Sequence, residues 1–195
     1  MANIALVYRK SALNQFIIGL YLLLGLWVTM DSLLSLMPAD YATARNVILF
    51  MGLGYLIDLA TGANGIIIAT SKYYRYDTWF MLVLVVFTLI TNITLIPIYG
   101  ITGAGIASCL TFALFNAARL IFIHVKFGMQ PFTKSFLYIA AIGAGSASAA
   151  YLLPTMGNGY IDILLRGGLF SLIFGALVLW SGVSPDINAV LRKFQ

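Results

Sequence analysis

Few side chains in this 195-residue sequence can do chemistry, and the most informative are those inside long apolar stretches. Asp58 is the deepest of them, near the middle of an apolar segment that runs from about residue 46 to 70. Charged and amide groups within a membrane span are costly, so they usually face a protein interior or an aqueous cavity. This reasoning selects six candidates for a polar pathway: Asp58, Asn64, Asn92, Asn116, Arg119 and Arg166.

Asp58 has two interpretations, and the sequence leaves both open. On a continuous helix it shares one face with Gly62 and Gly65, with Thr61 and Asn64 beside it. We expect no basic residue at a matching depth, and desolvation then favours the neutral form of a carboxyl group. The group is either a proton- or cation-linked site, or a neutral acid bonded to a neighbouring helix or to a segment outside this chain.

The two arginines also allow alternative roles. Arg119 follows Asn116 by three residues, and its long side chain either extends to the membrane interface or faces a central cavity with Asn116. Arg166 follows Asp162 by four residues, a spacing that favours a local ion pair. A planar guanidinium also has the geometry to hold two oxygens of an anion such as pyrophosphate.

The inventory of reactive residues excludes several classes of protein. Cys109 is the single cysteine, His124 is the single histidine, and there is no glutamate. Classical catalytic triads, histidine-rich metal sites and intrachain disulfides are therefore excluded, and we expect no enzyme, no metal and no cofactor. The net charge of +5 comes from scattered basic residues rather than a cluster, so no nucleic-acid partner is expected.

The composition places these residues in a membrane protein. Charged residues make up 9% of the chain, against about 25% in soluble domains, and apolar residues make up 62%. A bilayer core of about 30 Å requires about 20 helical residues to cross it. We therefore predict an all-α polytopic membrane protein, a single helical domain over 1–195 with about six spans. The spans are predicted at about 13–37, 46–70, 78–97, 99–123, 135–154 and 161–182.

Basic residues between the spans predict the orientation, because cytoplasmic loops are enriched in lysine and arginine. Arg45 is the only basic residue in the loops of the opposite side. Both termini are therefore predicted to be cytoplasmic, and the first segment is expected to stay in place rather than to be a cleaved signal peptide. The loops and ends of the predicted cytoplasmic side carry Arg9, Lys10, Lys72, Arg75, Lys126, Lys134, Arg192 and Lys193.

Small residues are concentrated in two spans. Residues 140–150 consist almost entirely of alanine, glycine and serine, which allow close packing of helices in lipid. The second span contains Gly52, Gly54, Gly62 and Gly65. These glycines indicate either close packing or a discontinuous helix that lines a cavity, as transporters use.

The hairpin between the third and fourth spans resembles a known family. Residues 92–108, NITLIPIYGITGAGIAS, are similar to the N-x-x-L-I-P-x-Y-G-x-x-G-A-x-x-A-[ST] hairpin of bacterial polysaccharide biosynthesis flippases. These belong to the multidrug/oligosaccharidyl-lipid/polysaccharide exporter superfamily. Pro97 is expected to end one helix before a short outer turn. The loops 127–132 (FGMQPF) and 71–76 (SKYYRY) look like the family's inner loops.

The resemblance implies one lobe of a two-lobed transporter in the bacterial inner membrane. Family members have about twelve to fourteen spans, and the hairpin lies in their C-terminal lobe. The implied partners are therefore membrane lipids, a lipid-linked oligosaccharide, and a missing N-terminal lobe or a second subunit. The implied function is translocation of undecaprenyl-pyrophosphate-linked oligosaccharide for O-antigen, capsule or exopolysaccharide biosynthesis.

Two other functions stay open. One is a lobe of a cation-coupled multidrug exporter of the same superfamily, which predicts dye efflux that depends on an ion gradient. The other is a non-transporting membrane scaffold that binds glycosyltransferases. A scaffold would tolerate substitution of Asp58 and of both arginines inside spans, but would fail when its cytoplasmic basic loops are altered.

Overall fold

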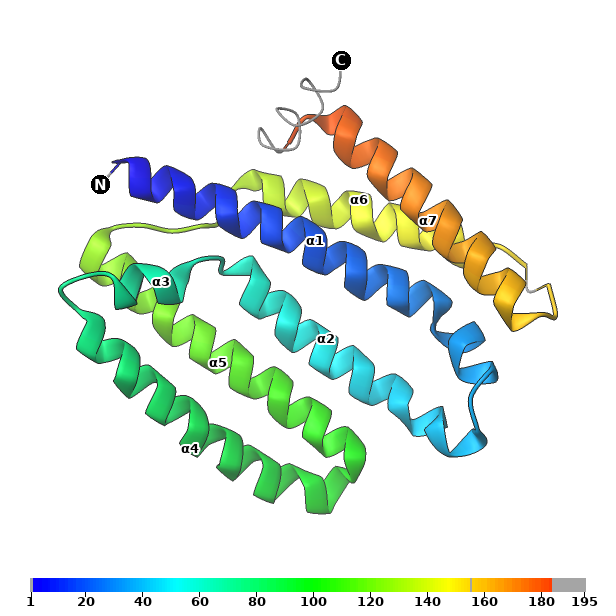
Figure 1. Ribbon diagram of the computed structural model, residues 1–195, viewed down its shortest axis with the longest axis horizontal. Coiled ribbons are helices and arrows are strands. Elements are labelled where there is room, and N and C mark those ends of the chain that lie inside the picture. The colour runs from blue at the N-terminus through cyan, green and yellow to red at the C-terminus, as the bar shows by residue number, and fades with distance from the viewer. Residues whose placement is uncertain (1, 155, 184–195) are drawn as a thin grey trace. The chain divides into compact units, whose positions relative to one another are not determined.

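The chain folds entirely into helices over the residues that the computed structural model describes, 2–154 and 156–183 (Figure 1). No strand occurs in these ranges. The helices in chain order are α1 (Ala2–Ser35), the 3-10 helix η1 (Ala39–Thr43), α2 (Ala44–Ala60), α3 (Asn64–Ala69), α4 (Tyr74–Tyr99), α5 (Ile101–Phe127), α6 (Lys134–Tyr151) and α7 (Gly159–Ser181).

Five helical stretches of the described chain are long and apolar enough to span a membrane, which fits the predicted all-α polytopic protein. The 18 residues of α6, which fall where the fifth span was predicted, are rich in alanine, glycine and serine, and α6 is not among the five. The five stretches are Asn3–Ser35, Ala39–Ala60, Tyr74–Tyr99, Ile101–Phe127 and Gly159–Ser181.

One helix extends beyond its predicted span, and one predicted helix end is wrong. Helix α1 begins at Ala2, ahead of the span predicted from about residue 13, because residues 2–12 contain no glycine or proline that would end a helix. Helix α4 continues through Pro97 to Tyr99. Proline removes one backbone donor, but the ladder resumes after it, since the Gly100 amide donates to the Ile96 carbonyl at 2.8 Å.

The described residues fall into two compact units. Unit 1 is drawn from Met1–Gln15 and Thr43–Pro131, and unit 2 from Phe16–Ala42 and Phe132–Gln195. Helix α1 therefore contributes its first part to unit 1 and its remainder to unit 2. The single domain predicted over the whole chain stays a prediction.

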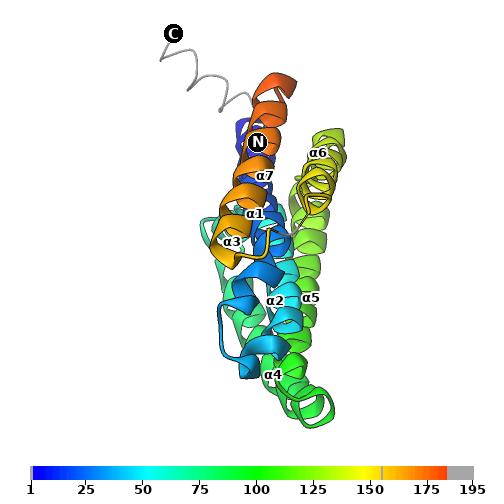
Figure 2. The same cartoon turned by 90° about the vertical axis from the view of Figure 1, so that its right-hand side faces the viewer.

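In unit 1, α5 lies between α2 and α4 in Figure 1, and these three helices also run close together in Figure 2. The α4–α5 hairpin is tight, because a Cβ atom added to Gly103 would lie 2.2 Å from the Leu95 carbonyl oxygen. At one end of the unit, Tyr8 packs with Ile68 and Ile123 in a buried apolar cluster. This packing ties the start of α1 to α3 and α5.

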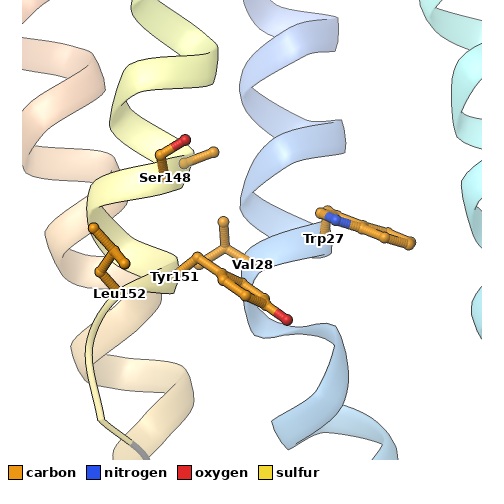
Figure 3. Close-up of a pocket in the computed structure, with 6 residues that line it drawn as sticks. Trp27, Val28, Ser148, Tyr151 and Leu152 are labelled. Atoms are coloured by element: carbon orange, nitrogen blue, oxygen red, sulfur yellow. The ribbon is translucent and has the colours of Figure 1, made fainter.

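Unit 2 joins the second part of α1 to α6 and α7. The Tyr21 ring of α1 stacks on Phe170 of α7, with 5.6 Å between the ring centroids, and its hydroxyl is 2.8 Å from the Ser171 hydroxyl. Figure 3 shows an apolar pocket of about 400 Å³ between α1 and α6, where the Tyr151 ring extends toward Val28. Small residues on α6, predicted to allow close packing, form one wall of this pocket.

Candidate functional site

The second predicted span is not one helix, because the chain breaks between α2 and α3 at residues 61–63. Gly62 has φ +63°, a left-handed conformation that favours glycine. A Cβ atom at this position would also lie 2.7 Å from the Cα atom of Ala12 on α1. The left-handed turn and the close approach of α1 together explain why the break falls at this glycine. The glycines of this span therefore show both features that were considered, a helix break at Gly62 and close packing at Gly54, where an added Cβ atom would lie 3.0 Å from the Cys109 Cα atom.

The break corrects the predicted position of Asp58. The carboxylate is not at the middle of a continuous helix but two residues before the end of α2. Gly62 and Gly65 do not share its helical face, because they lie beyond the last regular turn. The side chains that gather around Asp58 come instead from the break itself and from α5.

Asn116 of α5 lies opposite the break and connects its polar side chains. Its Oδ1 atom accepts hydrogen bonds from Thr61 Oγ1 at 2.8 Å and from Asn64 Nδ2 at 2.9 Å. Its Nδ2 atom donates to Asp58 Oδ1 at 2.9 Å and to the Phe112 carbonyl oxygen at 3.0 Å. Both donors and both lone pairs of the amide are thus engaged, which determines the orientation of this side chain. We call Asp58, Thr61, Asn64 and Asn116 the polar cluster.

The polar cluster is buried except at its acid. Thr61, Asn64 and Asn116 are 1%, 4% and 0% exposed, whereas Asp58 is half-buried. The hydroxyl and amide groups of the cluster are engaged with one another, so the Asp58 carboxylate is the group of the cluster that could bind a proton or a small hard cation. Among the described residues there is no group of three or more Asp, Glu, His or Cys side chains that would hold a metal ion.

Arg119, one turn after Asn116, lies beside the polar cluster and is buried. Its Nη2 atom is 2.5 Å from Asp77 Oδ1, and its guanidinium lies 4.1 Å from the centroid of the Phe115 ring. The i, i+3 spacing on α5 directs Asn116 and Arg119 to the same side. A basic residue therefore lies one helical turn from the amide that bonds to Asp58, which the sequence reasoning did not anticipate.

Sequence reasoning missed Asp77 and undervalued Thr61. Asp77 immediately precedes the predicted third span, 78–97, and it lies in the first turn of α4. An acid is favoured there by the helix dipole, and an isolated acid directly after the basic residues Lys72 and Arg75 was the available signal. Thr61 was seen only as a neighbour of Asp58, because its bond to Asn116 depends on the break.

Asn92 is not part of the polar cluster. Its Nδ2 atom donates to the carbonyl oxygen of Thr88, four residues earlier on the same helix, at 2.8 Å. Such a bond satisfies an amide locally and needs no partner from another helix. The contact that joins α4 to α5 nearby is instead made by the hydroxyl groups of Thr91 and Thr111, which are 3.2 Å apart.

Arg166 belongs to unit 2, and its bonds replace the predicted local ion pair with Asp162. The Arg166 Nη2 atom donates to the Leu153 carbonyl oxygen at 2.9 Å, and Asp162 Oδ1 accepts from the Met156 amide at 2.8 Å. Arg166 and Asp162 thus each bond to a backbone group of the α6–α7 loop, and these bonds take the place of the expected ion pair between them. Both side chains, together with Asp31, line a polar pocket of about 330 Å³ in unit 2.

Gly65 leaves the space that the Arg119 guanidinium occupies, since a Cβ atom there would lie 2.8 Å from Arg119 Nη1. We expect Gly65→Ala to displace this group from Asp77 and to lower the free energy of unfolding by about 1–3 kcal/mol. Gly145→Ala is the matched control, because no atom outside its own helix lies within 4 Å of the added carbon. The free energy of unfolding of both variants is measured in detergent. An equal decrease for Gly65→Ala and Gly145→Ala would contradict the proposed packing.

Comparisons with known proteins give no relative from which to interpret these groups. No family model matches the chain, and neither a curated protein nor a solved structure matches it. The site is therefore defined by its own geometry: a buried polar cluster at an interrupted helix, beside the Arg119–Asp77 ion pair.

Proposed function

We propose that this chain is one lobe of a membrane transporter in which the polar cluster takes part in proton or cation coupling. The observation that carries the proposal is the buried, hydrogen-bonded set of Asp58, Thr61, Asn64 and Asn116 at an interrupted helix. Transporters use discontinuous helices at their binding and coupling sites. Irregular backbone at membrane depth is tolerated where protein or an aqueous cavity surrounds it.

The proposed substrate is an undecaprenyl-pyrophosphate-linked oligosaccharide, moved across the bacterial inner membrane for O-antigen, capsule or exopolysaccharide biosynthesis. Support for this substrate comes from the resemblance of residues 92–108 to the flippase hairpin. A pyrophosphate group requires cationic contacts, and Arg166 is the better placed of the two arginines. It lines a pocket, and its Nη2 atom donates to the Leu153 carbonyl oxygen rather than to a carboxylate. An anion at Arg119 would compete with Asp77.

The proposed membrane arrangement has six spans, with α6 as the fifth and α7 as the sixth, and cytoplasmic termini. The Nζ atoms of Lys72 and Lys126 lie 5.1 and 5.8 Å from the centroid of the same Tyr73 ring. The α3–α4 loop and the last turn of α5, which carry two of the basic residues predicted to be cytoplasmic, therefore lie close together, as the arrangement requires. Arg192 and Lys193, which contribute to the predicted orientation, lie outside the described residues.

Asp58→Asn tests the coupling role. The amide keeps the size of the side chain and an acceptor oxygen for Asn116, but it removes the negative charge that binds a proton or cation. We expect transport to be abolished while abundance in the membrane falls less than about twofold. Transport is measured as the exposure of the lipid-linked oligosaccharide to a membrane-impermeant lectin on spheroplasts.

The control for this variant is Asp40→Asn, which removes the same charge at an exposed residue of η1. It is expected to leave transport and abundance unchanged. If Asp58→Asn loses transport only in proportion to its abundance, the carboxylate has a structural role alone and the coupling proposal fails.

A cation-coupled multidrug exporter lobe is the second candidate, and the half-buried carboxylate at the break favours it equally. The two functions differ in what they transport. Dye efflux that requires an ion gradient and is indifferent to glycolipid supply would replace the flippase proposal. Exposure of the glycolipid to lectin that depends on the protein and on glycolipid supply would support it.

The proposed N-terminal lobe or second subunit is a separate question. It is tested by the intact mass of the protein and by crosslinking in the native membrane.

A further inference from the structure

Unit 1 contains an apolar crevice of about 750 Å³ at the end where α1 begins. Its volume is within the range of about 300–1,000 Å³ that is typical of pockets for organic ligands. Val7 and Ile66 line it and are 63% and 66% exposed, so its walls are open to the surrounding lipid. Its apolar wall is formed by Ile4, Val7, Tyr8, Ile66, Ile67 and Met129.

The crevice has a basic rim. Lys72 lines it directly, and Lys126 adjoins Phe127, which also lines it. The ammonium groups of both lysines approach the same Tyr73 ring, as described above, so a cation from the α3–α4 loop and one from the last turn of α5 converge at the rim. Asp77, the acid nearest to Lys72 in the sequence, is already paired with Arg119.

Arg9 adds a third cation at this end of unit 1. Its Nε atom donates to the Gln130 carbonyl oxygen at 3.2 Å, which attaches the segment after α5 to the start of α1. In Figure 1 this segment passes along the N-terminal part of α1. Met129 of the same segment is buried against Tyr8. The bond therefore stabilises one wall of the crevice and keeps a guanidinium near its rim.

We propose that the crevice binds one anionic phospholipid, with its acyl chains against the apolar wall and its phosphate at Lys72 and Lys126. The charge of the rim complements an anionic head group, and clustered basic residues at a membrane surface attract such lipids. A free phosphate ion has no apolar group that would contact the apolar wall, so a lipid fits the crevice better. The proposal depends only on the membrane location of the chain and not on the proposed transport, so it stands or fails independently.

The test is native mass spectrometry of the full chain in detergent, titrated with phosphatidylglycerol or with phosphatidylcholine of the same acyl chains. We expect one retained phosphatidylglycerol and weaker retention of phosphatidylcholine. The double variant Lys72→Gln/Lys126→Gln is expected to weaken phosphatidylglycerol binding roughly 10- to 30-fold, since each basic residue contributes about fivefold. Lys134→Gln, an exposed lysine that does not line the crevice, is the charge control and should change binding less than about twofold.

A second pair of variants tests the apolar wall. Val7→Trp fills the crevice and is expected to abolish retention, whereas Val125→Trp, at a residue that is 69% exposed and outside the crevice, should retain the lipid. If Val7→Trp does not elute as a monodisperse species, Ile66→Trp replaces it. Equal retention of both lipids, or retention unaffected by the lysine and tryptophan variants, would overturn the proposal. Preferential retention of undecaprenyl pyrophosphate over phosphatidylglycerol would also overturn it, by assigning the crevice to the carrier.

Discussion

Asn116→Leu is expected to lower the free energy of unfolding by about 2–4 kcal/mol and to abolish any activity that depends on Asp58. The leucine has a similar volume but removes every hydrogen bond that the amide makes to Asp58, Thr61 and Asn64. Thr61 keeps its bond to the Asp58 carbonyl oxygen and Asn64 keeps its bond to Thr61, so the cost is the loss of one bond at each of these buried groups. A bond lost from a buried group costs about 1–3 kcal/mol when no water replaces it. Asp58 is half-buried, so water can replace the bond that its carboxylate loses and reduce this cost.

The matched control for this variant is Asn92→Leu on α4. Asn92 donates only to a carbonyl oxygen of its own helix, so its loss leaves no side chain of another helix without a partner. We expect its stability to change by no more than about 0.5 kcal/mol, the usual range for substitutions away from a buried network. Thermal unfolding in one detergent compares the two variants directly. Equal destabilisation would show that Asn116 does not connect the polar cluster.

Asp77→Asn is expected to lower the free energy of unfolding by about 3–5 kcal/mol, because it leaves the buried Arg119 cation without its counter-charge. Arg119→Met should cost only about 1–2 kcal/mol. The reason for the difference is exposure: the Asp77 side chain is 22% exposed and able to be solvated, whereas that of Arg119 is 7% exposed. Methionine also fills the space over the Phe115 ring.

The double variant Asp77→Asn/Arg119→Met separates the ion pair from its surroundings. With both charges removed, its stability should be close to that of Arg119→Met alone. The coupling free energy from the double-mutant cycle is then at least about 2 kcal/mol. Losses that simply add would mean that the two side chains do not stabilise each other, and that the short contact between them contributes nothing.

The elements of the fold were largely predictable. Apolar runs of membrane-spanning length predict helices because lipid offers backbone groups no partners, and each predicted span has a helix in the structure. The ends were less predictable. Pro97 was expected to end α4, but losing one backbone bond did not prevent the following residues from bonding to the preceding turn. Small residues likewise predicted close packing without specifying which helices would approach.

Part of the candidate site was also predictable. A carboxylate or amide inside an apolar stretch needs a partner, so Asp58, Asn64 and Asn116 were identified by residue type alone. That rule selects Asn92 equally, although the structure shows its amide bonded within α4. It also misses Asp77, which lies just outside an apolar stretch and whose partner, Arg119, is 42 positions away in the sequence.

By itself, the sequence determined the helical class of this protein and which side chains had to find polar partners. Both follow from local quantities, namely the length of an apolar run and the cost of a polar group within it. The tertiary structure alone decided where the second span breaks and that Asn116 lies opposite the break. It also decided that Arg119 is buried and pairs with Asp77. These outcomes depend on the close approach of Ala12 to Gly62 and on the register of α5 against α2 and α4, and no local pattern encodes the distance between separate helices.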